Sequence, residues 1–311
     1  MSVRIGFLPW PQCADWASFL DVARRIDRAG YDSLWTWDHL MAIVGPPDGP
    51  IFEGWTALAA WAVATERVEL GLMVAANTFR NPGVVAKMAV TVDHISGGRA
   101  WLGLGGAWFD EEHDAFGIDF GAGFGERLDR LDEAVGALRA ILGGETFTSP
   151  EGSYYRFREA RLSPPPLRDR LPIMIGGSGE RKTLRTVAAY ADGWNTGGSV
   201  ERVARKVAVL EEHCAAVGRD PAEIERTFGP SIVIRDDPEE ARRVYAAALA
   251  HNGDVFTGEE DAWFGPPEAI AERWRPYLAY GMRHLIADLP APFDLETVER
   301  LIEVQALLAN E

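Results

Sequence analysis

The pair Asp38-His39 carries the clearest acid–base chemistry in this sequence. It follows the aromatic and apolar segment 33–37, so we expect it at the end of a buried strand, beside rings that can wall off a planar ligand. A histidine in that position can give or take a proton near neutral pH. An aspartate that caps a loop beside a histidine without a role would give the same pattern, and the spacing leaves both interpretations open.

A second signal is a turn rich in glycine and serine, at 176–179, which follows an apolar segment and precedes a predicted helix at about 180–190. The free N–H groups and the dipole of a helix N-terminus favour a bound anion. Two basic residues at the turn add positive charge to an otherwise acidic chain. We therefore predict a phosphate site whose contacts are Gly176, Gly177, Ser178, Arg181 and Lys182. A flexible turn without a ligand is the alternative.

Two further strand ends carry weaker signals. Asn77 follows the apolar segment 68–74 and could form a hydrogen bond with a heterocycle. Gly105 and Gly106 end the next apolar segment and could let the backbone turn tightly against a ring or a phosphate. The acidic run 110–112 could supply a carboxylate, or could simply be the solvated start of a helix.

The elements that must position these residues alternate along the chain. Short apolar runs, typical of buried parallel strands, are each followed by a segment with helical periodicity. The predicted strands are 3–8, 33–38, 68–74, 100–105, 172–177, 192–197, 228–234 and 284–289. Eight such units predict an α/β fold of the (β/α)8 TIM-barrel type, in which chemistry gathers at the C-terminal ends of the strands. A doubly wound open sheet shares the alternation and is the alternative.

Length and composition limit the classes of function. We expect a single TIM-barrel catalytic domain over 1–311, with insertions at about 145–167 and 249–267. The net charge of −16 argues against binding to nucleic acid or to an anionic membrane, since both need a positive face. The two cysteines and six histidines show no metal-ligand spacing, so no metal site is expected. The sequence shows no signal peptide or membrane span, and we expect a cytoplasmic protein.

Four motifs at the strand ends resemble the luciferase-like monooxygenase superfamily, and within it the branch that uses the deazaflavin coenzyme F420. The likeness covers nearly the whole chain. The motifs are W-x-W-D-H at 35–39, L-G-x-x-V-x-x-x-T-F-R-N-P at 70–82, G-L-G-G-A-W-F-D-E-E-H-x-x-F-G-I at 103–118 and P-I-M-I-G-G-S-G-E-R-K-T-L-R-x-V-A-x-Y-A-D-G-W-N at 172–195.

The resemblance implies roles for particular residues. Asp38 and His39 would flank the redox ring and the substrate, with His39 managing the proton. Met73 and Val74 would form a bulge with a non-proline cis peptide bond that supports the central ring. Some members carry a proton-donating carboxylate in the loop after the fourth strand, and Glu111 is our candidate for it here.

The same resemblance implies the reaction and the partners. We expect hydride transfer between C5 of coenzyme F420 and a small-molecule substrate such as an alcohol, an enone or an imine. One alternative is a monooxygenase that uses O₂ and FMN, with the flavin reduced by a separate reductase. Another is a flavin-binding homologue without catalytic activity. The resemblance also implies a homodimer.

Overall fold

A closed parallel barrel forms the centre of the molecule. The computed structural model describes residues 3–254 and 262–308. The barrel strands, in their order around the sheet, are β1 (Arg4–Pro9), β2 (Ser33–Thr36), β3 (Glu69–Leu72), β5 (Ala100–Gly105), β6 (Ile173–Gly176), β7 (Gly193–Thr196), β8 (Glu225–Phe228) and β11 (Met282–Leu289). The pairing of β1 with β11, from Arg4 opposite His284 to Pro9 opposite Leu289, closes the ring. The predicted (β/α)8 barrel is confirmed, and the open sheet is excluded because its edge strands would not pair.

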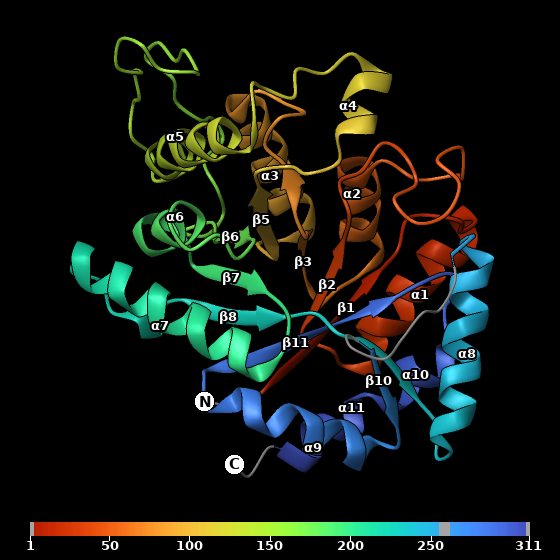
Figure 1. The fold of residues 1–311 in the computed structure, drawn as a ribbon. Helices are drawn as coiled ribbons and strands as arrows, with labels where there is room; N and C mark the ends of the chain where they lie inside the picture. Colours follow the sequence, from red (N-terminus) through yellow and green to blue (C-terminus); the bar gives the residue numbers. More distant parts are fainter. Residues whose placement is uncertain (1–2, 255–261, 309–311) are drawn as a thin grey trace.

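Helices surround this barrel (Figure 1). They are α1 (Trp16–Ala29), α2 (Gly54–Ala64), α3 (Pro82–Ser96), α4 (Asp110–Phe116), α5 (Phe124–Leu142), α6 (Thr183–Tyr190), α7 (Val200–Val217), α8 (Pro238–His251), α9 (Pro267–Leu278), α10 (Leu295–Arg300) and α11 (Ile302–Leu308). Local sequence sets many of their ends. The Asp15 side chain accepts a hydrogen bond from the N–H of Ser18 at the start of α1, and Gly30 ends that helix in the left-handed region at φ 97°. Asn81 caps α3 in the same way, with Pro82 in its first turn.

The apolar core has two parts, as the alternation of side chains along a strand requires. The larger part lies between the strands and the helices and includes Leu34, Trp61 and Trp194. The smaller part includes Leu8, Trp35, Trp101 and Met174, which come from different barrel strands. Because bulky side chains fill the barrel in this way, ligands are restricted to the ends of the strands.

Three features depart from the simplest barrel. The predicted strand 228–234 is divided into β8 and β9 (Ser231–Ile234) at Gly229-Pro230. Part of the predicted insertion at 249–267 forms strand β10 (Ala262–Gly265), which pairs with β9, while its residues 255–261 lie outside the described residues. The predicted excursion at 145–167 is held by an antiparallel bridge between Phe147 and Ala160 and extends beyond α5 (Figure 1).

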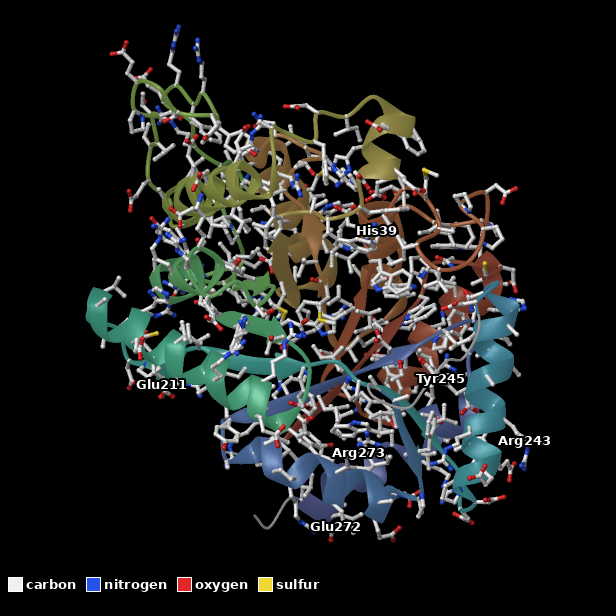
Figure 2. The ribbon with its side chains drawn as sticks, viewed as in Figure 1. His39, Glu211, Arg243, Tyr245, Glu272 and Arg273 are labelled. Carbon is white, nitrogen blue, oxygen red and sulfur yellow. The ribbon has the colours of Figure 1, made fainter. Side chains whose placement is uncertain are left out.

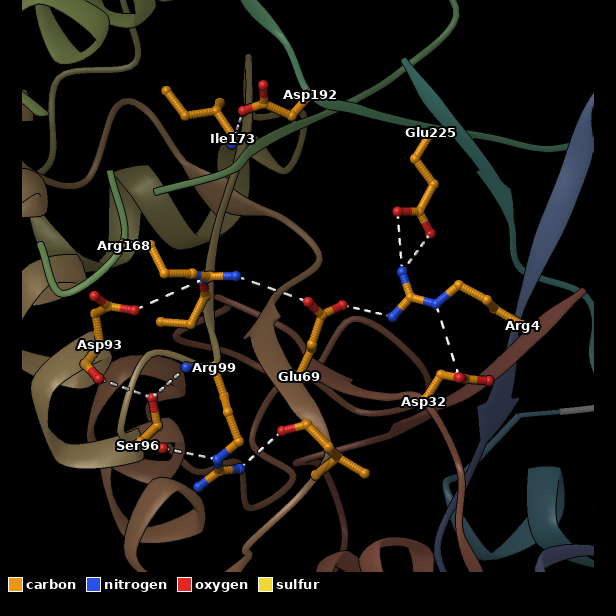
Figure 3. A network of polar contacts seen from close by, with 12 residues as sticks. Arg4, Asp32, Glu69, Asp93, Ser96, Arg99, Arg168, Ile173, Asp192 and Glu225 are labelled. Atoms are coloured by element: carbon orange, nitrogen blue, oxygen red, sulfur yellow. Dashed lines mark hydrogen bonds and ion pairs between the residues drawn. The ribbon is translucent and has the colours of Figure 1, made fainter. Parts of the chain in front are cut away.

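Charged side chains tie the barrel together at the N-terminal ends of its strands (Figure 3). Arg4 of β1 donates to Glu225 of β8 at 2.9 Å and 3.0 Å and to Glu69 of β3 at 2.5 Å. The Nδ1 atom of His284, on β11, lies 2.5 Å from the same Glu225 carboxylate. The N-terminal end of a (β/α)8 barrel usually contributes to stability and not to catalysis. We therefore expect this network to stabilise the fold.

Candidate functional site

A cavity of about 560 Å³ opens at the C-terminal ends of the strands. Asp38 and His39 line it after β2, and Met73 and Val74 line it after β3. The ends of β5 and β6 and the residues just after them form further parts of the wall, among them Gly105, Gly106, Trp108, Gly176, Gly177 and Ser178. Four strand ends far apart in the sequence therefore meet at one site, as the barrel requires.

Asp38 is buried at this site, and one of its oxygens is already bound. Its Oδ2 accepts the N–H of Ala76 at 3.0 Å and a hydrogen bond from Arg80 at 2.8 Å. Its Oδ1 is buried without a partner among the described residues. Burial raises the pKa of Asp38, although the charge of Arg80 opposes the shift. An orphaned acceptor beside a cavity is suited to an N–H donor on a ligand, since a buried polar atom without a partner costs free energy.

His39 is held in a fixed orientation by a carboxylate. Its Nδ1 lies 2.9 Å from Oε1 of Glu112, whose Oε2 accepts the N–H of Leu40 at 2.8 Å. The ring is bordered by aromatic side chains, including Trp108 at 5.7 Å between centroids, and Figure 2 shows His39 at the same end of the barrel as α4. If Nδ1–H donates to Glu112, the Nε2 atom of the neutral ring is left as a proton acceptor.

The cavity wall is a cradle of main chain. The peptide bond between Met73 and Val74 is cis, as the resemblance implies. A Cβ atom added at Gly105 would lie 2.6 Å from Cγ2 of Val74, and one at Gly176 would lie 3.0 Å from both methyl carbons of Val74. Glycine at these positions therefore lets the ends of β5 and β6 close on the bulge and leaves its outer surface to a ligand.

The predicted phosphate turn is brought to the cavity only in part. Gly176, Gly177 and Ser178 line it, with Gly179 and Thr183 beside them. Arg181 is exposed and lies outside the lining, and Lys182 donates to the carbonyl of Gly125 at 2.9 Å and pairs with Asp129 at 2.7 Å. Helix α6 begins at Thr183, a few residues later than expected, so both cations precede it, and Lys182 is engaged by Gly125 and Asp129 instead.

Two predicted residues face elsewhere. Asn77 is buried, but its amide donates to the hydroxyl of Tyr155 at 2.9 Å and it does not line the cavity. Glu111 is exposed on α4, while its neighbour Glu112 is 1% exposed and contacts His39. The structure therefore brings Glu112, and not Glu111, to His39, because successive helix positions are turned by about 100° from each other.

Sequence reasoning missed three contributors. Glu112 could have been found from the spacing of Phe109, Glu112 and His113, which places them on one helix face. Arg80 was noted only as an anion contact, and its pairing with Asp38 follows from the barrel. Asn195 lines the cavity near the end of β7; it is the last residue of the motif at 172–195 but was not singled out as a contact.

These features fit a flavin or a deazaflavin. A planar tricyclic ring needs a flat, partly apolar wall, which the bulge and the glycines supply. The orphaned Oδ1 of Asp38 suits a ring N–H. In the turn at 176–179 the Gly177 N–H is donated to the carbonyl of Asn195, and the main chain of Ser178 and Gly179 lies at the cavity, where a phosphate would meet it. Among residues 3–254 and 262–308, no group of three His, Cys, Asp or Glu side chains is arranged to hold a metal ion.

Comparison with known protein families decides between barrels that share this geometry. The model of the luciferase-like monooxygenase family matches residues 5–291. The chain belongs to this family. The four strand ends described above lie within the residues that this family model matches.

Relatives and solved structures agree with the family assignment. The chain is 30% identical over 321 residues to an F420-dependent glucose-6-phosphate dehydrogenase of Nakamurella multipartita, covering 93% of this chain and 91% of the relative. It matches an uncharacterised protein of Mycobacterium tuberculosis with 31% identity over 166 residues, 53% of this chain, and spans 57% of that relative's length.

The fold is shared with luciferase-like proteins that use different coenzymes. An F420-dependent secondary alcohol dehydrogenase, solved with an F420-acetone adduct, superposes with a TM-score of 0.82 and 19% identity, covering 98% of both chains. The oxygenating component of 3,6-diketocamphane monooxygenase from Pseudomonas putida, solved with FMN, gives a TM-score of 0.75 and 16% identity over 100% of this chain and 99% of that one. At these identities the likeness establishes the fold alone. No helix in the described part of this luciferase-like chain is long and apolar enough to cross a membrane.

Proposed function

We propose that this protein is an F420-dependent oxidoreductase that transfers a hydride between C5 of the deazaflavin and a carbon atom of a small organic substrate. The observation that carries the proposal is the pairing of His39 with the buried Glu112 at the edge of the coenzyme-binding cavity. The relative from Nakamurella, similar over 93% of this chain, is named for F420 dependence and supports the choice of coenzyme.

The side chains of the site then have separate tasks. Asp38 would hold the ring through Oδ1, and Ser178 with the neighbouring main chain would hold a phosphate. Coenzyme F420, when bound, exchanges a hydride at C5 and does not activate O₂. His39, oriented by Glu112, would take the proton from a substrate hydroxyl or amine as the hydride leaves, or return it in the reverse direction. Trp108 and Phe109 border the imidazole and would limit the access of water.

Coenzyme titration is the first test. The purified protein is titrated with F420 and with FMN, each oxidised and reduced, while tryptophan and coenzyme fluorescence are followed. Tight binding of F420 alone would support the proposal. A preference for FMN, with O₂ consumption from FMNH₂, would replace it with a luciferase-like monooxygenase that needs a separate reductase. Binding of neither coenzyme would contradict the assignment of the cavity, and binding without turnover would indicate the non-catalytic homologue.

His39→Ala tests the proton-transfer step. It should abolish most turnover while coenzyme binding persists, because the hydrogen bonds proposed for the coenzyme come from other residues. Unchanged turnover in His39→Ala would refute the role. A homodimer remains our expectation for the assembly, and light scattering of the purified protein tests it.

A further inference from the structure

A second chamber of about 340 Å³ adjoins the coenzyme-binding cavity. It shares five lining residues with that cavity, which are Trp37, Met73, Gly177, Ser178 and Asn195. It then continues to Leu8, Thr196, Gly229 and Asp288 on the other side of the barrel mouth. A substrate that reaches from the edge of the coenzyme-binding cavity beside His39 into this chamber would have its far end near Asp288.

Asp288 is an acid for which the proposed reaction has no use. It lies one residue before the end of β11, between Leu8 of β1 and Ser231 of β9 in the sheet. Burial raises the pKa of its carboxyl to about 7, and the indole N–H of Trp10 lowers it only in part. That N–H forms no hydrogen bond of ordinary geometry with any described residue. A carboxylate placed in this way costs free energy unless a ligand compensates its charge.

The other polar side chains of the chamber can accept hydrogen bonds. The hydroxyl oxygen of Thr196 is buried, with the residue 6% exposed, and has no partner within the described ranges. Asn195 donates its amide N–H to Thr227 at 2.9 Å, which leaves its carbonyl oxygen as an acceptor. The oxygen of Ser178 receives a hydrogen bond from Arg202 at 3.3 Å.

The charged side chains around the chamber also favour a cationic ligand. The chamber lining contains no Lys, Arg or His side chain among the described residues. Arg202 of α7 and Tyr277 of α9 line the adjoining outer cavity, but Asp288 forms no ion pair with any residue that the structure describes. The Trp37 ring lies 4.7 Å from the Trp10 ring between centroids, tilted by 35°, and gives the chamber an aromatic wall, which also attracts cations.

We infer that this chamber binds a protonated amine of the substrate, with Asp288 as its counter-ion and Thr196 and Asn195 as further acceptors. An ammonium group has three N–H donors and no acceptor, which matches three acceptors and one negative charge. The inference rests on the proposed function, because it specifies the substrate class of the same site. The oxidoreductase thus acts on amine-bearing molecules.

Matched probes test the chamber directly. Cyclohexylamine, which stays protonated throughout, and cyclohexanol are titrated into the protein by calorimetry at about pH 8. We expect the amine to bind roughly tenfold more tightly than the alcohol, the effect of one charge-assisted hydrogen bond. Amine affinity should also rise as the pH rises from about 6 to about 8, because Asp288 ionises over that interval.

Variants locate the effect. Asp288→Asn keeps the shape and should remove the preference for the amine, and Thr196→Val should weaken amine binding without changing the charge. Asp114→Asn, an exposed position on α4, changes the net charge equally and should leave the preference intact. These measurements need no enzymatic turnover.

The outcomes separate the two proposals. Equal affinity for the amine and the alcohol in the wild-type protein, or a preference that survives Asp288→Asn, would overturn the inference. Amine affinity that rises as the pH falls would overturn it as well. Binding of F420 is titrated in the same samples, and its loss alongside an intact amine preference would reject the proposed function and leave the chamber assignment standing.

Discussion

At the scale of single residues, the site depends on how two carboxylates are used. One oxygen of Asp38 accepts a hydrogen bond from Arg80, and the other is left for a ligand. The carboxylate of Glu112 instead orients His39. A carboxylate that fixes an imidazole typically changes activity by 10–100-fold when it is removed, because the ring loses its tautomer and its orientation. Glu112 is therefore a positioning residue, and His39 is the group that meets the substrate.

Glu112→Gln should lower kcat by about 10–100-fold and leave the affinity for F420 nearly unchanged. The neutral amide can still accept the hydrogen bond of Nδ1–H but no longer stabilises the imidazolium. The pH profile of kcat should therefore shift, which a purely structural role would not cause. Glu111→Gln, one position away on the exposed side of α4, is the comparison. Equal losses in the two variants would contradict the assignment to Glu112.

At the scale of elements, the ends of β5 and β6 can approach the bulge after β3 because each of them carries a glycine at the point of contact. The end of β5 approaches the bulge after β3 so closely that a Cβ atom at Gly105 would collide with Val74. Val74 is β-branched and has little rotational freedom with which to yield. The excursion at 145–167 is fixed to the same region, because Tyr155 accepts a hydrogen bond from Asn77 just after β4 (Ala75–Ala76).

Gly105→Ala should displace Val74 and so weaken F420 binding by at least roughly tenfold, with a loss of stability of about 1–3 kcal/mol from overpacking. Gly123→Ala is the control, because a Cβ atom there meets open space in an extended backbone. Fluorescence titration and thermal unfolding measure the two effects. Wild-type F420 affinity in Gly105→Ala would show that the close approach is not needed.

Tyr155→Phe should loosen the excursion and leave the barrel intact. It removes the 2.9 Å hydrogen bond to Asn77, which is worth about 0.5–1.5 kcal/mol. Hydrogen exchange of the amides at 145–167 should accelerate, while that of the barrel strands stays the same. Tyr154→Phe is the matched control, since this neighbouring side chain is half exposed. Faster exchange in both variants would mean that the hydrogen bond between Tyr155 and Asn77 does not hold the excursion in place.

At the scale of the whole molecule, one end of the barrel forms the candidate ligand site and the other end stabilises the fold. The C-terminal end is concave and rich in glycine, and it includes Oδ1 of Asp38 and the hydroxyl of Thr196, which have no partner among the described residues. The N-terminal end is a network in which Arg4 joins β1 to β3 and β8 (Figure 3). Burial alone would raise the pKa of Glu225, but its hydrogen bond with His284 and the charge of Arg4 outweigh it and lower the pKa below its ordinary value.

This network predicts acid sensitivity. A lowered pKa means that the Glu225 carboxylate contributes stability above its ordinary pKa of 4.5 and that this contribution is lost as the pH falls through the folded-state value. Glu225→Gln should therefore lower the free energy of unfolding by about 1–3 kcal/mol at neutral pH and flatten its decline below about pH 4.5. Glu212→Gln, on the exposed face of α7, is the control for charge. Urea unfolding at several pH values checks both, and parallel pH curves for wild type and Glu225→Gln would count against the network.

The sequence by itself determined the elements and the end of the barrel where chemistry occurs. Strand and helix positions depend on local periodicity and on caps such as Asp15 and Asn81, so they can be predicted from neighbouring residues. Asp38, His39 and the glycines after β5 and β6 were placed at the cavity because parallel strands carry their C-terminal ends to one face. The family resemblance supplied the cis peptide bond at Met73-Val74, which no local pattern would have predicted.

Only the tertiary structure decided which side chains meet. The choice of Glu112 over Glu111 depends on the rotation of a short helix, and a single position reverses the face. Asn77 and Lys182 have side chains that could bind a ligand. In the structure Asn77 forms a hydrogen bond with Tyr155 and Lys182 forms an ion pair with Asp129, and both partners lie far away in the sequence. The chamber at Asp288 joins residues from β1, β7 and β11, so its negative charge and the absence of a basic side chain from its described lining arise only once the barrel has closed.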